Sequence, residues 1–162
     1  MDTFKAAVIL LVEDDPGDQK LIKTSLLNEK IINEVHIANS GEEALKYLQH
    51  SKNFDVEAPM PDLILLDLNM PGMSGKEFLR QIKSDDEIRS IPVVILTTSD
   101  SDKDILESYK LQAAGYIKKP MSLEELQNVM LNLSEYWFVI CKRVQPSNKY
   151  KHETKRCFVS GC

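Results

Sequence analysis

The sequence has few cysteines and no long apolar run, and both absences narrow the kind of protein it can be. Its 162 residues include three cysteines, all late in the chain and none with metal-ligand spacing. An odd count of this kind argues against a disulfide framework. No apolar stretch approaches the roughly 20 residues that a membrane helix needs, and the N-terminal residues lack the layout of a signal peptide. We therefore expect a reduced, cytoplasmic protein with no membrane partner.

Basic charge is scarce as well. The 20 Lys and Arg residues are outnumbered by 25 Asp and Glu residues, which gives a net charge of −5. Such a balance provides no overall field that would attract nucleic acid. No patterned segment suited to a helix-turn-helix module follows the main pattern either. We therefore expect no nucleic-acid partner, and an output through contact with other proteins.

Five apolar stretches recur along the chain, and they are separated by longer amphipathic ones. Three of them contain Val, Ile and Leu without alternation, which is typical of strands buried on both faces of a parallel sheet. The other two are shorter and less apolar, as expected nearer a sheet edge. The expected strands are residues 6–12, 35–38, 62–67, 92–97 and 115–119.

Helices are expected after each of these strands, which implies one parallel sheet with helices on both faces. Three of the helices begin with a Ser-x-x-Glu capping box, and one begins with an N-cap aspartate followed by proline. The helix over 102–111 carries Ile105, Leu106 and Tyr109 on its apolar side, and residues 50–61 read as a surface loop. The expected starts are Asp15–Pro16, Ser40, Ser74, Asp102 and Ser122.

Polar side chains stand where four of the expected strands end. They are Glu13 and Asp14, then Asp67, Thr97 and Lys119. The carboxyl ends of parallel strands meet at one edge of a sheet, and ligands of open α/β sheets bind there. Each of these residues alone would be read as a helix cap or a surface charge. Together they predict a functional site with Asp67 at its centre.

The chemistry of this group suits phosphoryl transfer. Gathered carboxylates repel one another and bind a hard cation, and oxygen ligands without His or Cys indicate Mg²⁺. Lys119 supplies a positive charge and Thr97 a hydroxyl donor for phosphoryl oxygens. A carboxylate that attacks phosphorus needs such neutralisation of the charge that develops. We therefore expect Asp67 to be a phosphate acceptor.

Four segments of the sequence resemble the receiver domain of response regulators, over about residues 6–135. They are Val12–Asp15, Leu66–Gly75, Leu96–Ser99 and Tyr116–Pro120. The resemblance implies a flavodoxin-like (βα)5 fold, a doubly wound parallel sheet with strand order 2-1-3-4-5. It also implies a single-domain response regulator of a two-component phosphorelay, with a sensor histidine kinase upstream and a protein target downstream. Phosphotransfer and autodephosphorylation would be self-catalysed, without turnover of a separate substrate.

The resemblance implies roles for the acidic residues around the metal. Asp67 would take the phosphoryl group from the phosphohistidine of the kinase. Asp14 and Asp67 would bind Mg²⁺ directly, with the backbone carbonyl of Asn69 as a third ligand. Glu13 would act through water.

The remaining implied roles belong to the phosphoryl contacts and the conformational switch. Thr97 and Lys119 would contact phosphoryl oxygens, and Tyr116 would be the rotamer switch that follows Thr97. The bond between Lys119 and Pro120 resembles the cis peptide of the family.

A narrower resemblance links the chain to stand-alone receivers that partner phytochrome-type histidine kinases. It rests on Glu13–Asp18, the long loop before the central strand, Leu96–Ser99 and Glu135–Phe138. Members of that group tend to dimerise, so a homodimer is a possible assembly here. We expect a receiver domain over 1–140, and a flexible basic tail over 141–162 because the apolar period fades there.

Three adjacent aromatic residues, Tyr136, Trp137 and Phe138, allow two interpretations. Neighbouring side chains on a helix cannot all face the same way. They could cover the end of the domain's own core, where aromatic residues commonly lie. They could instead form a dimer or kinase-docking interface, where aromatic residues are enriched.

Three rival functions remain for comparison. A Mg²⁺-dependent phosphatase with an aspartyl nucleophile usually needs a second acid two residues later, and Asn69 cannot serve as that acid. A flavodoxin-type FMN carrier needs a phosphate loop with free N–H groups, whereas Glu13–Asp15 would repel the phosphate. A phosphorylation-independent, receiver-like scaffold or dimerisation module is the third alternative, against which the intact group of site residues argues.

Overall fold

The computed structural model describes residues 7–27 and 32–140. Strands and helices alternate along this part of the chain, and a six-residue π-helix extends the last α-helix. The elements are β1 (Ala7–Val12), α1 (Pro16–Leu27), β2 (Ile32–Ala38), α2 (Gly41–Lys52), β3 (Leu63–Leu66), α3 (Gly75–Lys83), β4 (Val93–Thr97), α4 (Asp102–Lys110), β5 (Gly115–Lys118), α5 (Leu123–Ser134) and η1 (Glu135–Ile140).

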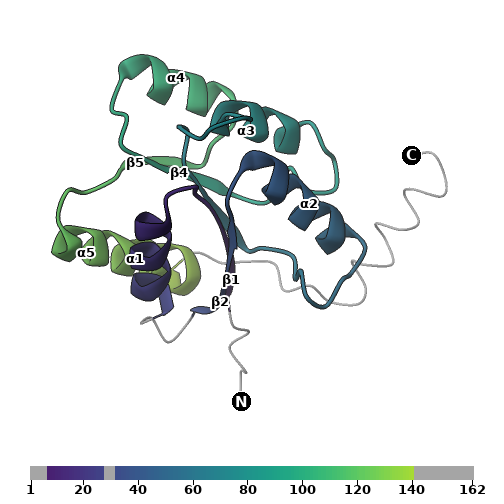
Figure 1. The fold of residues 1–162 in the computed structure, drawn as a ribbon, viewed down its shortest axis with the longest axis horizontal. Helices are drawn as coiled ribbons and strands as arrows, with labels where there is room; N and C mark the ends of the chain where they lie inside the picture. Colours follow the sequence, from purple (N-terminus) through teal and green to yellow (C-terminus); the bar gives the residue numbers. More distant parts are fainter. Residues whose placement is uncertain (1–6, 28–31, 141–162) are drawn as a thin grey trace.

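All five strands are parallel and lie in the order β2-β1-β3-β4-β5. Helices α1 and α5 cover one face of the sheet, and α2, α3 and α4 cover the other (Figure 1). This arrangement is the doubly wound, flavodoxin-like fold with the strand order that the resemblance implied, so the fold prediction is confirmed. Each crossover helix returns the chain to the end of the sheet where the strands begin. All strands therefore run in the same direction, and their carboxyl ends meet at one edge.

The central strand β3 explains why its sequence lacks alternation. All four of its residues are buried, because both faces of the strand meet a helical layer. Ile64 and Leu66 pack into the core under α2 and α3. Leu63 and Leu65 pack into the core under α1 and α5. A strand with two apolar faces is held in place from both sides, which fixes the position of Asp67 directly after it.

Side-chain caps start four of the helices where the sequence predicted them. The hydroxyls of Ser40, Ser74 and Ser122 each accept a hydrogen bond from the backbone N–H three residues later, at 3.1–3.2 Å. The Asp15 carboxylate accepts from the N–H of Asp18 at 2.8 Å, directly before the N1 proline. Ser101 caps α4 in the same way. These caps satisfy orphan N–H groups and set where each helix leaves its strand.

Three expectations about local structure are wrong. Residues 50–52 are not a loop, because α2 continues to Lys52. The expected core face of α4 is mostly exposed: 55% of Leu106 and 50% of Tyr109 are accessible to solvent. Only Ser108 of this helix is fully buried, and its hydroxyl donates to the carbonyl of Asp104. Helix α4 therefore turns a small residue toward the sheet, a choice that apolar periodicity does not reveal.

The third concerns Lys119 and Pro120, which are joined by a trans peptide bond, as no described bond is cis. The trans form is the intrinsic preference of a bond before proline, by about 0.5–1 kcal/mol. The backbone N–H of Lys119 donates to the carbonyl of Thr97 at 2.7 Å, so the end of β5 stays bonded to β4.

The aromatic residues after α5 lie in η1 and differ in exposure. Phe138 is buried in the core under α1 and α5, and the half-buried Trp137 packs against that core. Tyr136 is 55% exposed, with its ring centroid 5.7 Å from that of Trp137. Phe138 thus belongs to the core, and any interface would have to use Tyr136 and Trp137. The expected tail over 141–162 lies outside the described residues. No described helix is both long enough and apolar enough to cross a bilayer.

Candidate functional site

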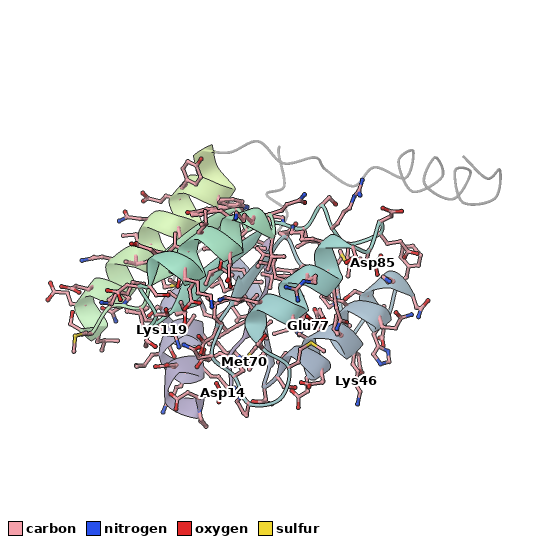
Figure 2. All side chains as sticks on the ribbon, turned by 90° about the horizontal axis from the view of Figure 1, so that it is seen from above. Asp14, Lys46, Met70, Glu77, Asp85 and Lys119 are labelled. Carbon is pink, nitrogen blue, oxygen red and sulfur yellow. The ribbon has the colours of Figure 1, made fainter. Side chains whose placement is uncertain are left out.

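The predicted site residues meet at the carboxyl edge of the sheet. Glu13 and Asp14 follow β1, Asp67 follows β3, Thr97 ends β4 and Lys119 follows β5. Asp14, Met70 and Lys119 mark three of the loops at this edge in Figure 2.

Three carboxylates form the acidic part of the site. Glu13, Asp14 and Asp67 each place an oxygen within 4.8 Å of the other two. Glu13 and Asp67 are buried, whereas Asp14 is half-buried. Burial raises the pKa of Glu13 to about 8, and its hydrogen bond to Asp67 acts in the same direction, although Lys119 opposes the shift. Burial therefore favours the protonated form of Glu13 when no cation is bound.

The Lys119 ammonium lies among the side chains of three acidic residues. Its Nζ atom is 2.9 Å from Asp18, 3.0 Å from Glu13 and 3.5 Å from Asp67. Burial lowers the pKa of Lys119, but the hydrogen bonds to Asp18 and Glu13 outweigh that effect, so the pKa lies above its ordinary range. The side chain is thus a permanent positive charge beside Asp67.

Thr97 contributes a buried hydroxyl that has no hydrogen-bond partner among the described residues. Leaving such a group unsatisfied costs about 1–3 kcal/mol. A ligand oxygen at the strand ends would remove that cost by accepting a hydrogen bond from the hydroxyl. The orphaned Thr97 hydroxyl is the observation that most clearly indicates an anionic ligand here.

Hydrogen bonds and close packing hold both ends of the loop after β3 in place. Within it, the Asn69 N–H donates to the Asp67 carboxylate at 3.3 Å. At its far end, a Cβ atom at Gly75 would lie 2.3 Å from the Asp67 carbonyl oxygen, so only glycine fits where α3 begins. The Met73 N–H donates to the Glu42 carboxylate of α2 at 3.0 Å. This last contact was missed from the sequence, where Glu42 stands only as a first-turn acid of its helix.

Tyr116 connects the site to the α3–α4 side of the molecule. Its hydroxyl donates to the Ser99 carbonyl at 2.8 Å, and the Ser99 hydroxyl donates to Asp104 at 2.5 Å. Asp104 also pairs with Lys76 of α3, which bonds Glu107 of α4 at 2.5 Å. These hydrogen bonds, first from Lys76 and then from Ser99, lower the pKa of Asp104 to about 2. The Lys76 pairs were not predicted, because nothing in the local pattern relates residues 28 and 31 positions apart.

The donor set fits a hard divalent cation. Its atoms are carboxylate oxygens from Glu13, Asp14 and Asp67, and the cluster contains no His or Cys. Oxygen ligands of this kind suit Mg²⁺, Mn²⁺ or Ca²⁺ and do not select zinc or copper. A bound cation would also displace the proton that burial favours on Glu13.

Comparison with known proteins identifies the family of this chain. Residues 9–131 match the family described as the response regulator receiver domain. The response regulator Rcp1 of Synechocystis sp. is 38% identical over 130 residues, which cover 80% of this chain and 88% of Rcp1.

Two solved structures are similar in fold and sequence. The phosphorylated cyanobacterial phytochrome response regulator RcpA superposes with a TM-score of 0.79 at 39% identity, over 88% of this chain and all of that one. The Mn²⁺-bound form of Rcp1 gives a TM-score of 0.77 at 35% identity, over 86% of this chain and 99% of that one. The chain therefore belongs to the response regulator receiver domain family, which signals by phosphorylation in two-component systems.

Proposed function

We propose that this receiver accepts a phosphoryl group on Asp67 from a histidine kinase, in a reaction that depends on Mg²⁺, and signals by protein contact. The observation that carries the proposal is the arrangement around Asp67. A buried carboxylate stands beside the permanent charge of Lys119 and near two further acids, at the sheet edge where Thr97 has an orphaned hydroxyl. Each part has a role in phosphoryl transfer and none is needed to complete the core.

The reaction forms a bond between a carboxylate oxygen of Asp67 and phosphorus while the P–N bond of the donor phosphohistidine breaks. The imidazole leaves with the electron pair of that bond. Lys119 and the Thr97 hydroxyl stabilise charge on the phosphoryl oxygens, and burial of Asp67 strengthens both interactions. The loop contact between the Asn69 N–H and Asp67 orients the acceptor.

A divalent cation, when bound, neutralises charge shared by the acceptor and the phosphoryl group. Asp14, Asp67 and the backbone carbonyl of Asn69 would hold it directly, and Glu13 through water. Mg²⁺ is the ion we propose, because it prefers oxygen ligands and keeps several waters. The Mn²⁺-bound structure of Rcp1 supports a divalent ion in a similar protein.

The upstream partner we propose is a phytochrome-type histidine kinase. This proposal depends on the similarity to Rcp1 and RcpA, the latter described as a cyanobacterial phytochrome response regulator. Downstream, we propose a protein target. We also propose that the protein forms a homodimer through Tyr136 and Trp137. Phosphotransfer from candidate kinases, timed against one another, would identify the partner.

Asp67→Asn tests the acceptor directly. With Mg²⁺ and a small acyl phosphate, we expect intact-mass spectrometry to show one added phosphoryl group on the full chain and none on the variant. The amide cannot attack phosphorus, although it keeps the shape of the carboxylate. Uptake by the variant at another carboxylate would contradict the assignment. Absence of uptake by the natural sequence would favour a phosphorylation-independent role.

A further inference from the structure

Asp18 makes the shortest ionic contact with the Lys119 ammonium, and it has no role in the site as proposed so far. Its carboxylate lies 2.9 Å from Nζ, closer than either Glu13 or Asp67. It comes from the first turn of α1, whereas the other two acids follow strands at the edge of the sheet. The lysine is therefore held from a helix as well as from the strand ends.

The three carboxylates differ in their access to water. The side chain of Asp18 is 38% exposed, whereas those of Glu13 and Asp67 are 2% and 8% exposed. A buried carboxylate that loses its cation stays poorly solvated and pays a desolvation cost. An exposed carboxylate regains water when it lets go. Of the three acids around Lys119, Asp18 is thus the one whose charge water can best stabilise after release.

The backbone of Asp18 is anchored, whereas its carboxylate faces an open pocket. Its backbone N–H is bound to the Asp15 carboxylate at 2.8 Å, which anchors the first turn of α1. Asp18 and Lys119 together line an open pocket between α1 and the start of α5, with Ile22, Thr98, Met121 and Leu126. The carboxylate can therefore turn into solvent without disturbing the helix.

We propose that Asp18 is a positioning residue that holds the Lys119 ammonium until Asp67 is phosphorylated, and that a phosphoryl oxygen then takes its place. The proposal rests on the function proposed above. An ammonium has three N–H donors, and in this structure three acidic side chains lie around Nζ. Asp67 itself carries the new group, so Asp18 is the exposed acid that competes with a phosphoryl oxygen for Nζ, and it yields because it alone is well hydrated. No covalent bond changes in this exchange; one ion pair replaces another.

Asp18→Asn provides the first test. Without the competing carboxylate, Lys119 is free to meet the incoming phosphoryl group. We expect phosphorylation of the full chain by acetyl phosphate with Mg²⁺ to be about 1.5- to 5-fold faster, the range for a partly exposed ion pair. Asp18→Glu keeps the charge and should stay near the natural rate. A rate for Asp18→Asn equal to or below that of the natural sequence would overturn the proposal.

Asp102→Asn is the matched control, because it also removes an exposed acid from the first turn of a helix. We expect it to leave the rate unchanged, whereas an equal acceleration would assign the effect to net charge. A second control is about 1 M salt, where the Debye length falls to about 3 Å. At 2.9 Å the contact effect of Asp18 is screened only in part there, whereas a general repulsion of the anionic donor acts over longer distances and is removed. Complete loss of the rate difference would contradict the exchange.

A spectroscopic readout separates this proposal from the function on which it rests. In protein labelled with ¹³C-lysine, we expect the Lys119 Cε signal of unphosphorylated Asp18→Asn to move toward that of the natural sequence with beryllofluoride, a phosphoryl mimic. An unmoved signal would overturn the role of Asp18 while leaving phosphorylation of Asp67 intact. Failure of both proteins to gain a phosphoryl group on Asp67 would refute the proposed function instead.

Discussion

At the scale of single residues, the site is built from groups that the fold leaves incompletely satisfied. The hydroxyl of Thr97 is buried without a partner, and burial leaves Glu13 with a proton that it would lose in water. A protein selected only for stability would replace both by apolar residues. Their presence together beside Lys119 indicates that a ligand completes the site.

Thr97→Val should separate function from stability. Valine has a similar shape without the hydroxyl, so we expect the free energy of unfolding to stay the same or rise by up to about 1 kcal/mol. Phosphorylation by acetyl phosphate should slow by about tenfold or more, because a donor to the phosphoryl group is lost. Denaturant titration and intact-mass time courses measure the two effects. Thr97→Ser, which keeps the hydroxyl, should retain the rate; a stable variant with an unchanged rate would show that Thr97 makes no phosphoryl contact.

At the scale of secondary-structure elements, the sequence predicts the local structure well and the contacts between elements poorly. Buried strands and capped helices follow from runs and motifs within about ten residues. The partner of Lys76 lies 28 residues away, and that of Glu42 lies 31 residues away. Such pairs depend on how helices are placed on the sheet, which no local period encodes. The exposed Leu106 and Tyr109 show the same limit.

The ion pairs of Lys76 join α3 to α4, and they should appear in the pH dependence of stability. The folded-state pKa of Asp104 is lowered from 3.8 to about 2, mainly by Lys76. A lowered pKa contributes stability that is present above pH 3.8 and is lost as pH falls toward 2.

We expect Lys76→Met to lower the free energy of unfolding by about 0.5–1 kcal/mol at neutral pH, as for a partly exposed pair. The difference from the natural sequence should shrink between pH 4 and pH 2, where Asp104 takes up its proton. Denaturant titrations across this range are the measurement. Lys103→Met removes an exposed lysine of α4 whose ammonium lies 4.0 Å from the Glu107 carboxylate, and it should change little. A difference that does not depend on pH would mean that the loss is one of packing.

At the scale of the whole molecule, the site residues lie together at one edge of the sheet, and the helices form the surfaces that partner proteins can contact. Fold and site position were predictable because polar residues at the ends of parallel strands must meet. Asp67, Thr97 and Lys119 were predicted for that reason. Asp18 was not, because a helix-borne acid joins the site only through the crossing of α1 over the sheet.

The fluorescence of Trp137, the single tryptophan, provides a test for self-association. Trp137 is half-buried next to the exposed Tyr136. If copies pair through this surface, water leaves the indole, and we expect its emission to shift to shorter wavelength as protein concentration rises. Sedimentation of the same samples checks the mass, and Tyr136→Ala should weaken the shift. Constant emission from a monomer at all concentrations would assign Trp137 to the domain's own core alone.

The π-helix η1 determines which aromatic side chain that surface offers. Leu133 and Phe138 are both buried and lie five residues apart, which is the spacing of i→i+5 bonding. With the usual i→i+4 spacing, Trp137 would follow Leu133 into the core, and Phe138 would turn outward. The outward-facing aromatic is therefore a property of helical pitch. Pitch, unlike composition, can change without a mutation, so a local rewinding of these six residues would exchange one aromatic face for another.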